Sequence, residues 1–158
     1  MKFDKLEILD LHYNKELSDI NILEKVNFKK LKELNLNSNE ISDINVLEKV
    51  NLKELKNLYL DSNKISDIKV LENIKFANLE ELYLGNNEIS DINVLEKVNF
   101  KELKILDLSY NKISDIKVLE NVNFEKLEYL NLLGNGINKE ENFSIIIRLK
   151  SKIKYVSI

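Results

Sequence analysis

The sequence predicts an α/β solenoid with a curved parallel sheet on its concave face, short helices on its convex face and a C-terminal cap. Three observations lead to this prediction. The 158-residue chain repeats with a period of 24 residues. Every repeat contains a strand pattern followed by a short helix pattern. No single repeat can bury its own row of leucines, so the repeats have to stack and share one core.

Three columns of residues, each recurring every 24 positions, define the period. They are Phe28, Leu52, Phe76, Phe100 and Phe124; Leu31, Leu55, Leu79, Leu103 and Leu127; and Asn39, Asn63, Asn87, Asn111 and Asn135. Six repeats follow, over residues 3–27, 28–51, 52–75, 76–99, 100–123 and 124–137, and residues 138–158 remain as the cap. The first repeat is one residue longer, and we place the additional residue at Glu16. The whole chain is therefore expected to be a single domain.

Within each repeat the first half predicts a strand and the second half a short helix. Leu58 and Leu60 alternate with other residues, which is typical of a strand with one buried face. Asn63 follows at a tight turn, where its amide can satisfy backbone groups of the loop. Ser66 and Asp67 then precede apolar residues at a spacing of three. This pattern predicts a short helix capped by one of these two side chains.

The two ends of the chain are expected to differ. After Ile137 the repeat pattern stops, and we expect a helix around residues 141–149 and a strand around residues 153–158 that cover the open core. At the other end the first repeat begins at Phe3, so its strand is predicted to be an unpaired edge. The chain being a fragment is the favoured explanation, with an edge that pairs with another chain and a tolerated open edge as alternatives.

The repeat motif identifies the chain as similar to a known family. Leu-x-x-Leu-x-Leu-x-x-Asn-x-Ile, as in Leu79 to Ile89, matches the leucine-rich repeat signature in six copies. The stretch Asn-x-Ile-Ser-Asp-Ile resembles the short-repeat class, which includes internalins and the regulatory subunits of type-one protein phosphatase. The Phe column departs from that class. The resemblance implies a curved solenoid that binds other proteins on its concave face. Asn142-Phe143, with Ile153 and Val156, loosely resembles the C-terminal cap of intracellular members.

Composition argues against several functional classes. The chain has no cysteine, which excludes disulfide scaffolds and thiolate metal sites. A net charge of −3 provides no basic excess to neutralise phosphates, so no nucleic-acid partner is expected. No apolar run approaches the length of a membrane span, and no apolar segment follows Met1. We therefore expect no membrane partner and a cytoplasmic location.

The chain is predicted to be neither an enzyme nor a cofactor-binding protein. His12 is the only histidine and has no nucleophile or metal-ligating neighbour in the sequence. One aspartate recurs in each repeat, at Asp19, Asp43, Asp67, Asp91 and Asp115. Calcium needs about six to eight oxygens around one point, whereas each of these aspartates is followed by isoleucine. We interpret the aspartates as helix caps and predict no metal.

The variable residues around the strand leucines are the predicted binding surface. They make up fewer than a fifth of the chain, yet they include His12 and five of the six tyrosines: Tyr13, Tyr59, Tyr83, Tyr110 and Tyr129. Tyrosine is a typical interface residue because it combines a large apolar ring with a polar tip. Tyr59 and Tyr83 are predicted to form one continuous anchor strip. The alternative is that tyrosine simply suits exposed strands.

The same positions carry an excess of acidic residues. Eight acids, among them Asp61, Glu81 and Asp107, stand against three lysines, which gives a net charge of −5. An acidic and aromatic face would attract a partner with a basic surface. Ordinary solvated charge is the alternative. The predicted protein-binding residues are His12, Tyr13, Tyr59, Asp61, Tyr83, Glu81, Asp107, Tyr110 and Tyr129.

These observations predict a protein–protein interaction module that binds its partner through the concave face. An intracellular scaffold or regulatory adaptor is the favoured role. The alternatives are an internalin-like surface adhesin and a structural spacer segment of a longer protein. The oligomeric state is left open.

Overall fold

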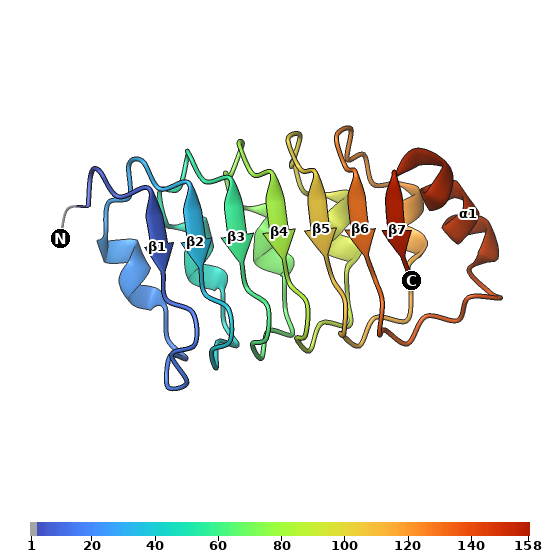
Figure 1. Cartoon of the computed structure of the whole chain (residues 1–158), viewed down its shortest axis with the longest axis horizontal. Helices are drawn as coiled ribbons and strands as arrows, with labels where there is room; N and C mark the ends of the chain where they lie inside the picture. Colours follow the sequence, from blue (N-terminus) through green and yellow to red (C-terminus); the bar gives the residue numbers. More distant parts are fainter. Residues whose placement is uncertain (1–2) are drawn as a thin grey trace.

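The computed structural model describes residues 3–158 and contains one seven-stranded parallel sheet (Figure 1). The strands are β1 (Ile8–Asp10), β2 (Glu33–Asn35), β3 (Asn57–Tyr59), β4 (Glu81–Tyr83), β5 (Ile105–Asp107), β6 (Tyr129–Asn131) and β7 (Tyr155–Ser157). Strand order follows sequence order, as expected for a solenoid in which each repeat contacts only its neighbours. The predicted α/β solenoid with a C-terminal cap is therefore confirmed.

Short helices form the side of the solenoid opposite the sheet. They are η1 (Asn21–Lys25), η2 (Asn45–Glu48), η3 (Lys69–Glu72), η4 (Asn93–Glu96) and η5 (Lys117–Glu120). Each is a 3-10 helix of one or two turns, as shown by the Leu71 N–H that donates to the Ile68 carbonyl at 3.0 Å. Apolar residues three apart suit this helix, because its residues i and i+3 lie on the same face.

The core lies between the sheet and these helices. Leu58 and Leu60 are completely buried, whereas Asn57 and Tyr59 on the other side of β3 are half-buried. This is the alternation that the sequence predicts for a strand with one buried face. Full burial of one such leucine contributes about 1.5–3 kcal/mol, so the stacked leucine columns stabilise the whole array.

A ladder of asparagines joins consecutive repeats. The Asn63 side-chain nitrogen donates to the Leu60 carbonyl at 3.1 Å and to the Leu36 carbonyl of the preceding repeat at 2.9 Å. Its side-chain oxygen accepts the Ile41 backbone N–H at 3.0 Å. Asn39, Asn87, Asn111 and Asn135 make corresponding bonds. The predicted role of the asparagine amide at the turn is confirmed, and the amide also bonds to the preceding repeat.

The recurring aspartates cap the short helices. The Asp67 carboxylate accepts the backbone N–H of Lys69, the first residue of η3, at 2.8 Å. The other four make the same bond at 2.7–2.9 Å: Asp19, Asp43, Asp91 and Asp115. The residue at the formal cap position is isoleucine, so each carboxylate acts from one residue further upstream. The structure thus supports the interpretation of this column as helix caps.

The first repeat contains its additional residue between Asn14 and Leu17. Asn14 donates its backbone N–H to Asn39, 25 positions later, and β1 pairs with β2 in the same 25-residue register. From Leu17 onward the 24-residue spacing is restored, so that Leu17 corresponds to Ile41. The Leu17 carbonyl accepts the Glu40 N–H and the Ile41 carbonyl accepts the Lys64 N–H, and in both bonds the donor lies 23 residues further along the chain. This location is consistent with the predicted insertion at Glu16.

The chain ends in the predicted helix and strand. Helix α1 (Phe143–Lys152) starts two residues later than expected and buries Ile145, Ile146 and Leu149. It packs against η5 and β7, and so covers the C-terminal end of the core (Figure 1). No helix within residues 3–158 is long and apolar enough to cross a membrane.

Candidate protein-binding face

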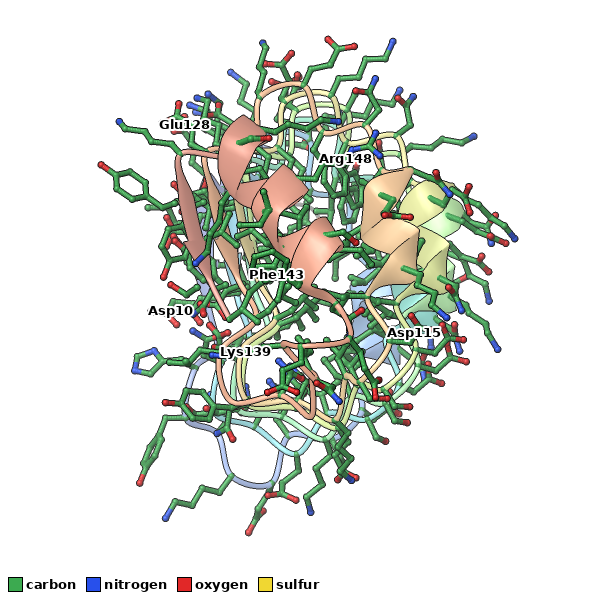
Figure 2. The ribbon with its side chains drawn as sticks, turned by 90° about the vertical axis from the view of Figure 1, so that its right-hand side faces the viewer. Asp10, Asp115, Glu128, Lys139, Phe143 and Arg148 are labelled. Carbon is green, nitrogen blue, oxygen red and sulfur yellow. The ribbon has the colours of Figure 1, made fainter. Side chains whose placement is uncertain are left out.

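The outward side of the sheet is a continuous surface that we call the strand face. Its first column is Ile8, Glu33, Asn57, Glu81, Ile105, Tyr129 and Tyr155, and its second is Asp10, Asn35, Tyr59, Tyr83, Asp107, Asn131 and Ser157. In Figure 2, Asp10 and Glu128 lie on this side of the molecule, whereas Asp115 lies on the side of the 3-10 helices. The strand register therefore determines which side chains become neighbours.

Tyr59 and Tyr83 stack at the middle of the strand face. Their ring centroids are 5.0 Å apart and their planes differ by 19°. In-register residues of parallel strands lie about 4.8 Å apart, so two aromatic residues in one column are placed to stack. The Asn57 amide donates to the Tyr59 hydroxyl at 3.2 Å, and the Tyr83 hydroxyl donates to Glu81 at 3.3 Å. The structure thus brings the two predicted tyrosines into one continuous strip.

Tyr13 and Tyr110 do not lie on strands. Both occupy the turn that follows a strand and have left-handed backbone angles, with φ of 58° and 51°. Ser38, Ser62 and Asn86 occupy the same conformation in other repeats. The two rings are 64% and 59% exposed and lie at the edge of the strand face. A tyrosine in this conformation is strained, since side chains with a Cβ avoid positive φ.

Tyr129 is on the strand face and has a neighbour that sequence reasoning missed. Tyr155 of β7 is directly in register with Tyr129 and is 55% exposed. The cap departs from the repeat pattern, so Tyr155 was not assigned to this surface. The available signal was the alternation around Val156, which lies in register with the buried Leu130. All six tyrosines therefore lie on the strand face or beside it.

His12 lies near the first strand and interacts with Asp10. Its Nδ1 is 2.7 Å from the Asp10 carboxylate, which also accepts the His12 backbone N–H at 3.0 Å. These two bonds lower the pKa of Asp10. Strand β2 separates His12 from the Tyr59–Tyr83 stack, so His12 is not part of that cluster.

Lysine and glutamate neutralise one another in the row that precedes the strands. Lys56 and Lys104 approach Glu80 at 2.7 and 2.5 Å, and Lys32 lies 2.8 Å from Glu7. The two ammonium groups lower the pKa of Glu80 to about 2. All three lysines of the predicted binding surface are therefore used in this row. Within residues 3–158, Glu33, Glu81, Asp61 and Asp107 form no ion pair with lysine or arginine.

Asp61 and Asp107 converge over Gly85, and we call them the carboxylate pair. Asp61 accepts the Gly85 backbone N–H at 2.7 Å, and Asp107 accepts the Ser109 N–H at 2.8 Å. A Cβ at position 85 would lie 3.0 Å from the Asp61 Oδ1 and 3.2 Å from the Asp107 Oδ1. A residue with a Cβ at this position would therefore require the two carboxylates to shift. The pKa of Asp61 is raised to about 6, mainly because the carboxyl group is partly buried and also because Asp107 is negatively charged.

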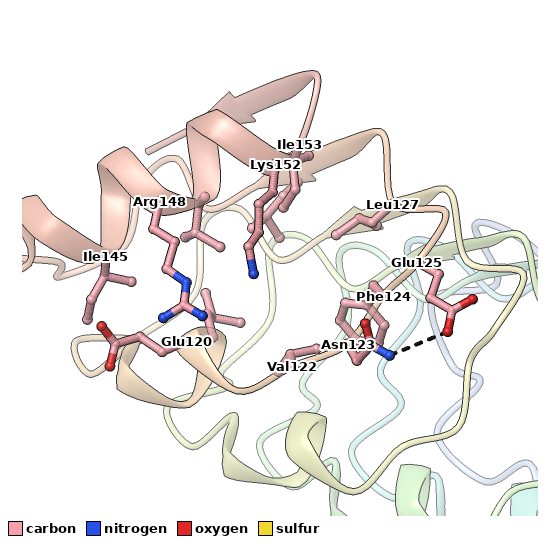
Figure 3. A pocket seen from close by; sticks show the side chains of 13 residues that line it. Glu120, Val122, Asn123, Phe124, Glu125, Leu127, Ile145, Arg148, Lys152 and Ile153 are labelled. Atoms are coloured by element: carbon pink, nitrogen blue, oxygen red, sulfur yellow. Dashed lines mark hydrogen bonds between the residues drawn. The ribbon is translucent and has the colours of Figure 1, made fainter.

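A separate pocket lies at the junction of α1 and η5 (Figure 3). Leu127, Ile145 and Leu149 contribute to its apolar lining, and Arg148 and Lys152 reach over it from α1. Glu120 and Glu125 also line it, so its charges have both signs. None of the predicted binding residues lines this pocket. No group of three or more His, Asp or Glu side chains in the part of the chain described here is arranged to hold a metal ion.

The chain belongs to the leucine-rich repeat family. Family models described as "Leucine Rich repeats (2 copies)" match residues 29–73 and 53–97, and one described as "Leucine rich repeat" matches residues 77–137. Together they extend over residues 29–137. No curated protein matches the chain. The family is generally one of non-enzymatic, protein-binding modules.

Solved structures of internalins are among those similar to this chain. An internalin (inlF) from Listeria monocytogenes is 28% identical with a TM-score of 0.69, over 97% of this chain and 48% of that one. An internalin C2 from the same organism is 25% identical with a TM-score of 0.67, over 98% and 71%. A leucine-rich repeat protein of Leptospira interrogans is 28% identical with a TM-score of 0.76, over 95% and 36%. The chain thus spans less than half the length of the internalin (inlF) and of the Leptospira protein. The predicted resemblance to internalins is confirmed.

Proposed function

We propose that this chain is a non-enzymatic module that binds a protein partner through the strand face, with Tyr59 and Tyr83 as its anchor. The observation that carries the proposal is the stacked pair at the middle of the sheet. Two aromatic rings with 5.0 Å between their centroids present a broad apolar area with polar tips. Family membership supports the same conclusion, because leucine-rich repeat domains typically bind proteins.

The stack is also ordered before any partner arrives. Both rings are half-buried, and each hydroxyl has a hydrogen-bond partner on its own strand. Less side-chain freedom is then lost on binding, which favours affinity. Strands β3 and β4 have neighbouring strands on both sides, so the anchor lies away from the ends of the face. Residues that dominate binding energy tend to lie near the centre of an interface.

Affinity capture from a lysate of the source organism tests this proposal. The native chain is compared with a Tyr59→Ala, Tyr83→Ala variant and with Phe143→Ala, which removes an exposed aromatic ring from α1. We expect the partner to be retained by Phe143→Ala and weakened at least about tenfold by the tyrosine double variant. Equal capture by all three chains would contradict the proposal and favour the structural spacer.

Two cellular roles follow from different observations. A cytoplasmic scaffold or regulatory adaptor is favoured by the loose resemblance of the cap to that of intracellular members. An internalin-like surface adhesin is favoured by the internalin structures that match 97% and 98% of this chain. Protease treatment of intact cells distinguishes the two roles. The adaptor survives the treatment, whereas the adhesin is degraded.

A further inference from the structure

The carboxylate pair has no cation of its own among the described residues. Lys56 and Lys104, from the same repeats as Asp61 and Asp107, both approach Glu80 in the row that precedes the strands. Asp107 is hydrogen-bonded by Ser109 and by Asn131, and Asp61 by the Gly85 N–H, and all of these donors are neutral. Two neighbouring, half-buried carboxylates therefore have no lysine or arginine partner within residues 3–158. This arrangement favours a positively charged group of a partner.

An aromatic surface borders the same place. One face of the Tyr83 ring is covered by Tyr59. Because the rings stack along the direction from β3 to β4, the other face of Tyr83 is directed toward β5. The in-register residue of β5 is Asp107, whose side chain is shorter than a tyrosine ring. Tyr83 is half-buried, and the ring face that Tyr59 does not cover lies on the side of the Asp107 carboxylate. Aromatic faces attract cations.

We propose that the carboxylate pair and the ring face of Tyr83 on the side of Asp107 together bind an arginine side chain of the protein partner. This inference rests on the proposed function and adds the chemistry of the group that the strand face recognises. A guanidinium is planar, stacks on an aromatic ring and carries donors that can reach two carboxylates at once. Lysine carries a more strongly hydrated point charge and stacks less well.

The ionisation of Asp61 agrees with this assignment. The raised pKa of Asp61 reflects first its burial and then the nearby charge of Asp107. A guanidinium placed between them would offset the repulsion and lower the pKa of Asp61 again. Gly85 favours this geometry, since a Cβ at this position would require the Asp61 and Asp107 side chains to shift.

Amide NMR with a defined probe tests the inference directly. The chain has only three glycines, Gly85, Gly134 and Gly136, so the Gly85 resonance is easily followed. The Gly85 N–H bonds to Asp61 and therefore reports on that carboxylate. The probe is N-acetyl-arginine methylamide, and the matched neutral control is N-acetyl-citrulline methylamide. We expect a saturable shift of Gly85 in the millimolar range with the arginine probe, and none with citrulline.

Two variants locate the effect. Asp61→Asn, Asp107→Asn is close in shape to the native pair and should weaken the arginine response at least about tenfold. Asp115→Asn, on the side of the 3-10 helices, should leave the response unchanged. A preserved dispersion of the amide spectrum shows that each variant is folded. N-acetyl-lysine methylamide is a further control. Three results would each overturn the assignment: no shift of Gly85 with the arginine probe, a shift of equal size with the citrulline or the lysine compound, or an unchanged shift in the double variant.

This outcome is separable from that of the capture experiment. Tyrosine-dependent capture with an unresponsive Gly85 would leave the proposed function standing and remove the arginine site. A responsive Gly85 without tyrosine-dependent capture would instead contradict the proposed function.

Discussion

The two ends of the solenoid differ in how their apolar residues are covered. At the C-terminal end α1 packs Ile145 and Leu149 over the last repeat, and Leu130 of β6 is 1% exposed. At the N-terminal end Leu9 of β1 is only partly buried, and Ile8 is 56% exposed. The two ends carry nearly the same repeat motif. Burial in a solenoid thus depends on having a neighbour on each side, and four predictions test how far that rule extends.

The largest effect is expected in the leucine column shared by all repeats. Leu82 in β4 is completely buried, whereas Leu9 occupies the same register in β1 and is partly exposed. We expect Leu82→Ala to lower the free energy of unfolding by about 3–5 kcal/mol, because it leaves a cavity. Leu9→Ala should cost about 1 kcal/mol. Urea denaturation of both variants measures the difference, and equal costs would refute the rule.

The asparagine ladder provides the second test. Asn87→Ala removes a buried amide that bonds to three backbone carbonyls and to the Ile65 N–H. We expect a loss of about 2–3 kcal/mol, since these backbone groups become unsatisfied. Asn14 begins the same ladder at the open end and is exposed. Asn14→Ala is the control, and its expected cost in thermal or urea unfolding is below about 1 kcal/mol.

The third prediction concerns the pH dependence of stability and compares Asp61 with Asp10. The pKa of Asp61 rises from an ordinary value of 3.8 to about 6 on folding, so the unfolded chain binds fewer protons between these values. Stability therefore decreases as the pH rises from about 4 to 6. Asp61→Asn should remove this decrease and stabilise the protein at pH 7 by about 1–2 kcal/mol, after allowance for solvent screening.

Asp10 at the open end is the matched control for Asp61. Its pKa is lowered by the bonds from His12, so its small contribution has the opposite sign and disappears only in acid. Urea unfolding between pH 4 and pH 7 separates the two residues. If the Asp61→Asn variant is no more stable at pH 7 than the native chain, then the surroundings of Asp61 do not disfavour its charged form.

The smallest effect is expected at Ile22. This residue is 62% exposed, although Val46 at the same repeat position is 4% exposed beneath its neighbours. We expect Ile22→Lys to change the free energy of unfolding by no more than about 0.5 kcal/mol. Val46→Lys should be strongly destabilising, because it buries a charge. A large effect of Ile22→Lys on the melting temperature would mean that this end is covered in solution.

The sequence was sufficient for the parts of the fold that repeat. The 24-residue period determines the strand register, the leucine core, the asparagine ladder and the aspartate caps, because each depends on contacts between equivalent positions. It also placed Tyr59 and Tyr83 side by side. Residues three apart in a helical segment do not separate an α-helix from a 3-10 helix when the segment is this short. The helical type therefore required the structure.

The site was predictable only in part. Tyr13 and Tyr110 were grouped with the strand residues, but the left-handed turn places them at the edge of the face. The net charge of −5 did not reveal that the three lysines pair in one row and leave the acids near Tyr83 unpaired. Asp61 and Asp107 converge over Gly85, which follows β4 in the repeat between them, and composition alone does not show that these three positions are neighbours.

The placement of all six tyrosines has a spectroscopic consequence. The chain contains no tryptophan, so its ultraviolet fluorescence comes from tyrosine. Every tyrosine lies on the strand face or at its edge, and the Tyr83 hydroxyl donates a hydrogen bond to the Glu81 carboxylate, which can quench its fluorescence. The tyrosine emission of the unlabelled protein therefore reports on the strand face alone. A molecule that binds to the strand face should change the intensity of this emission.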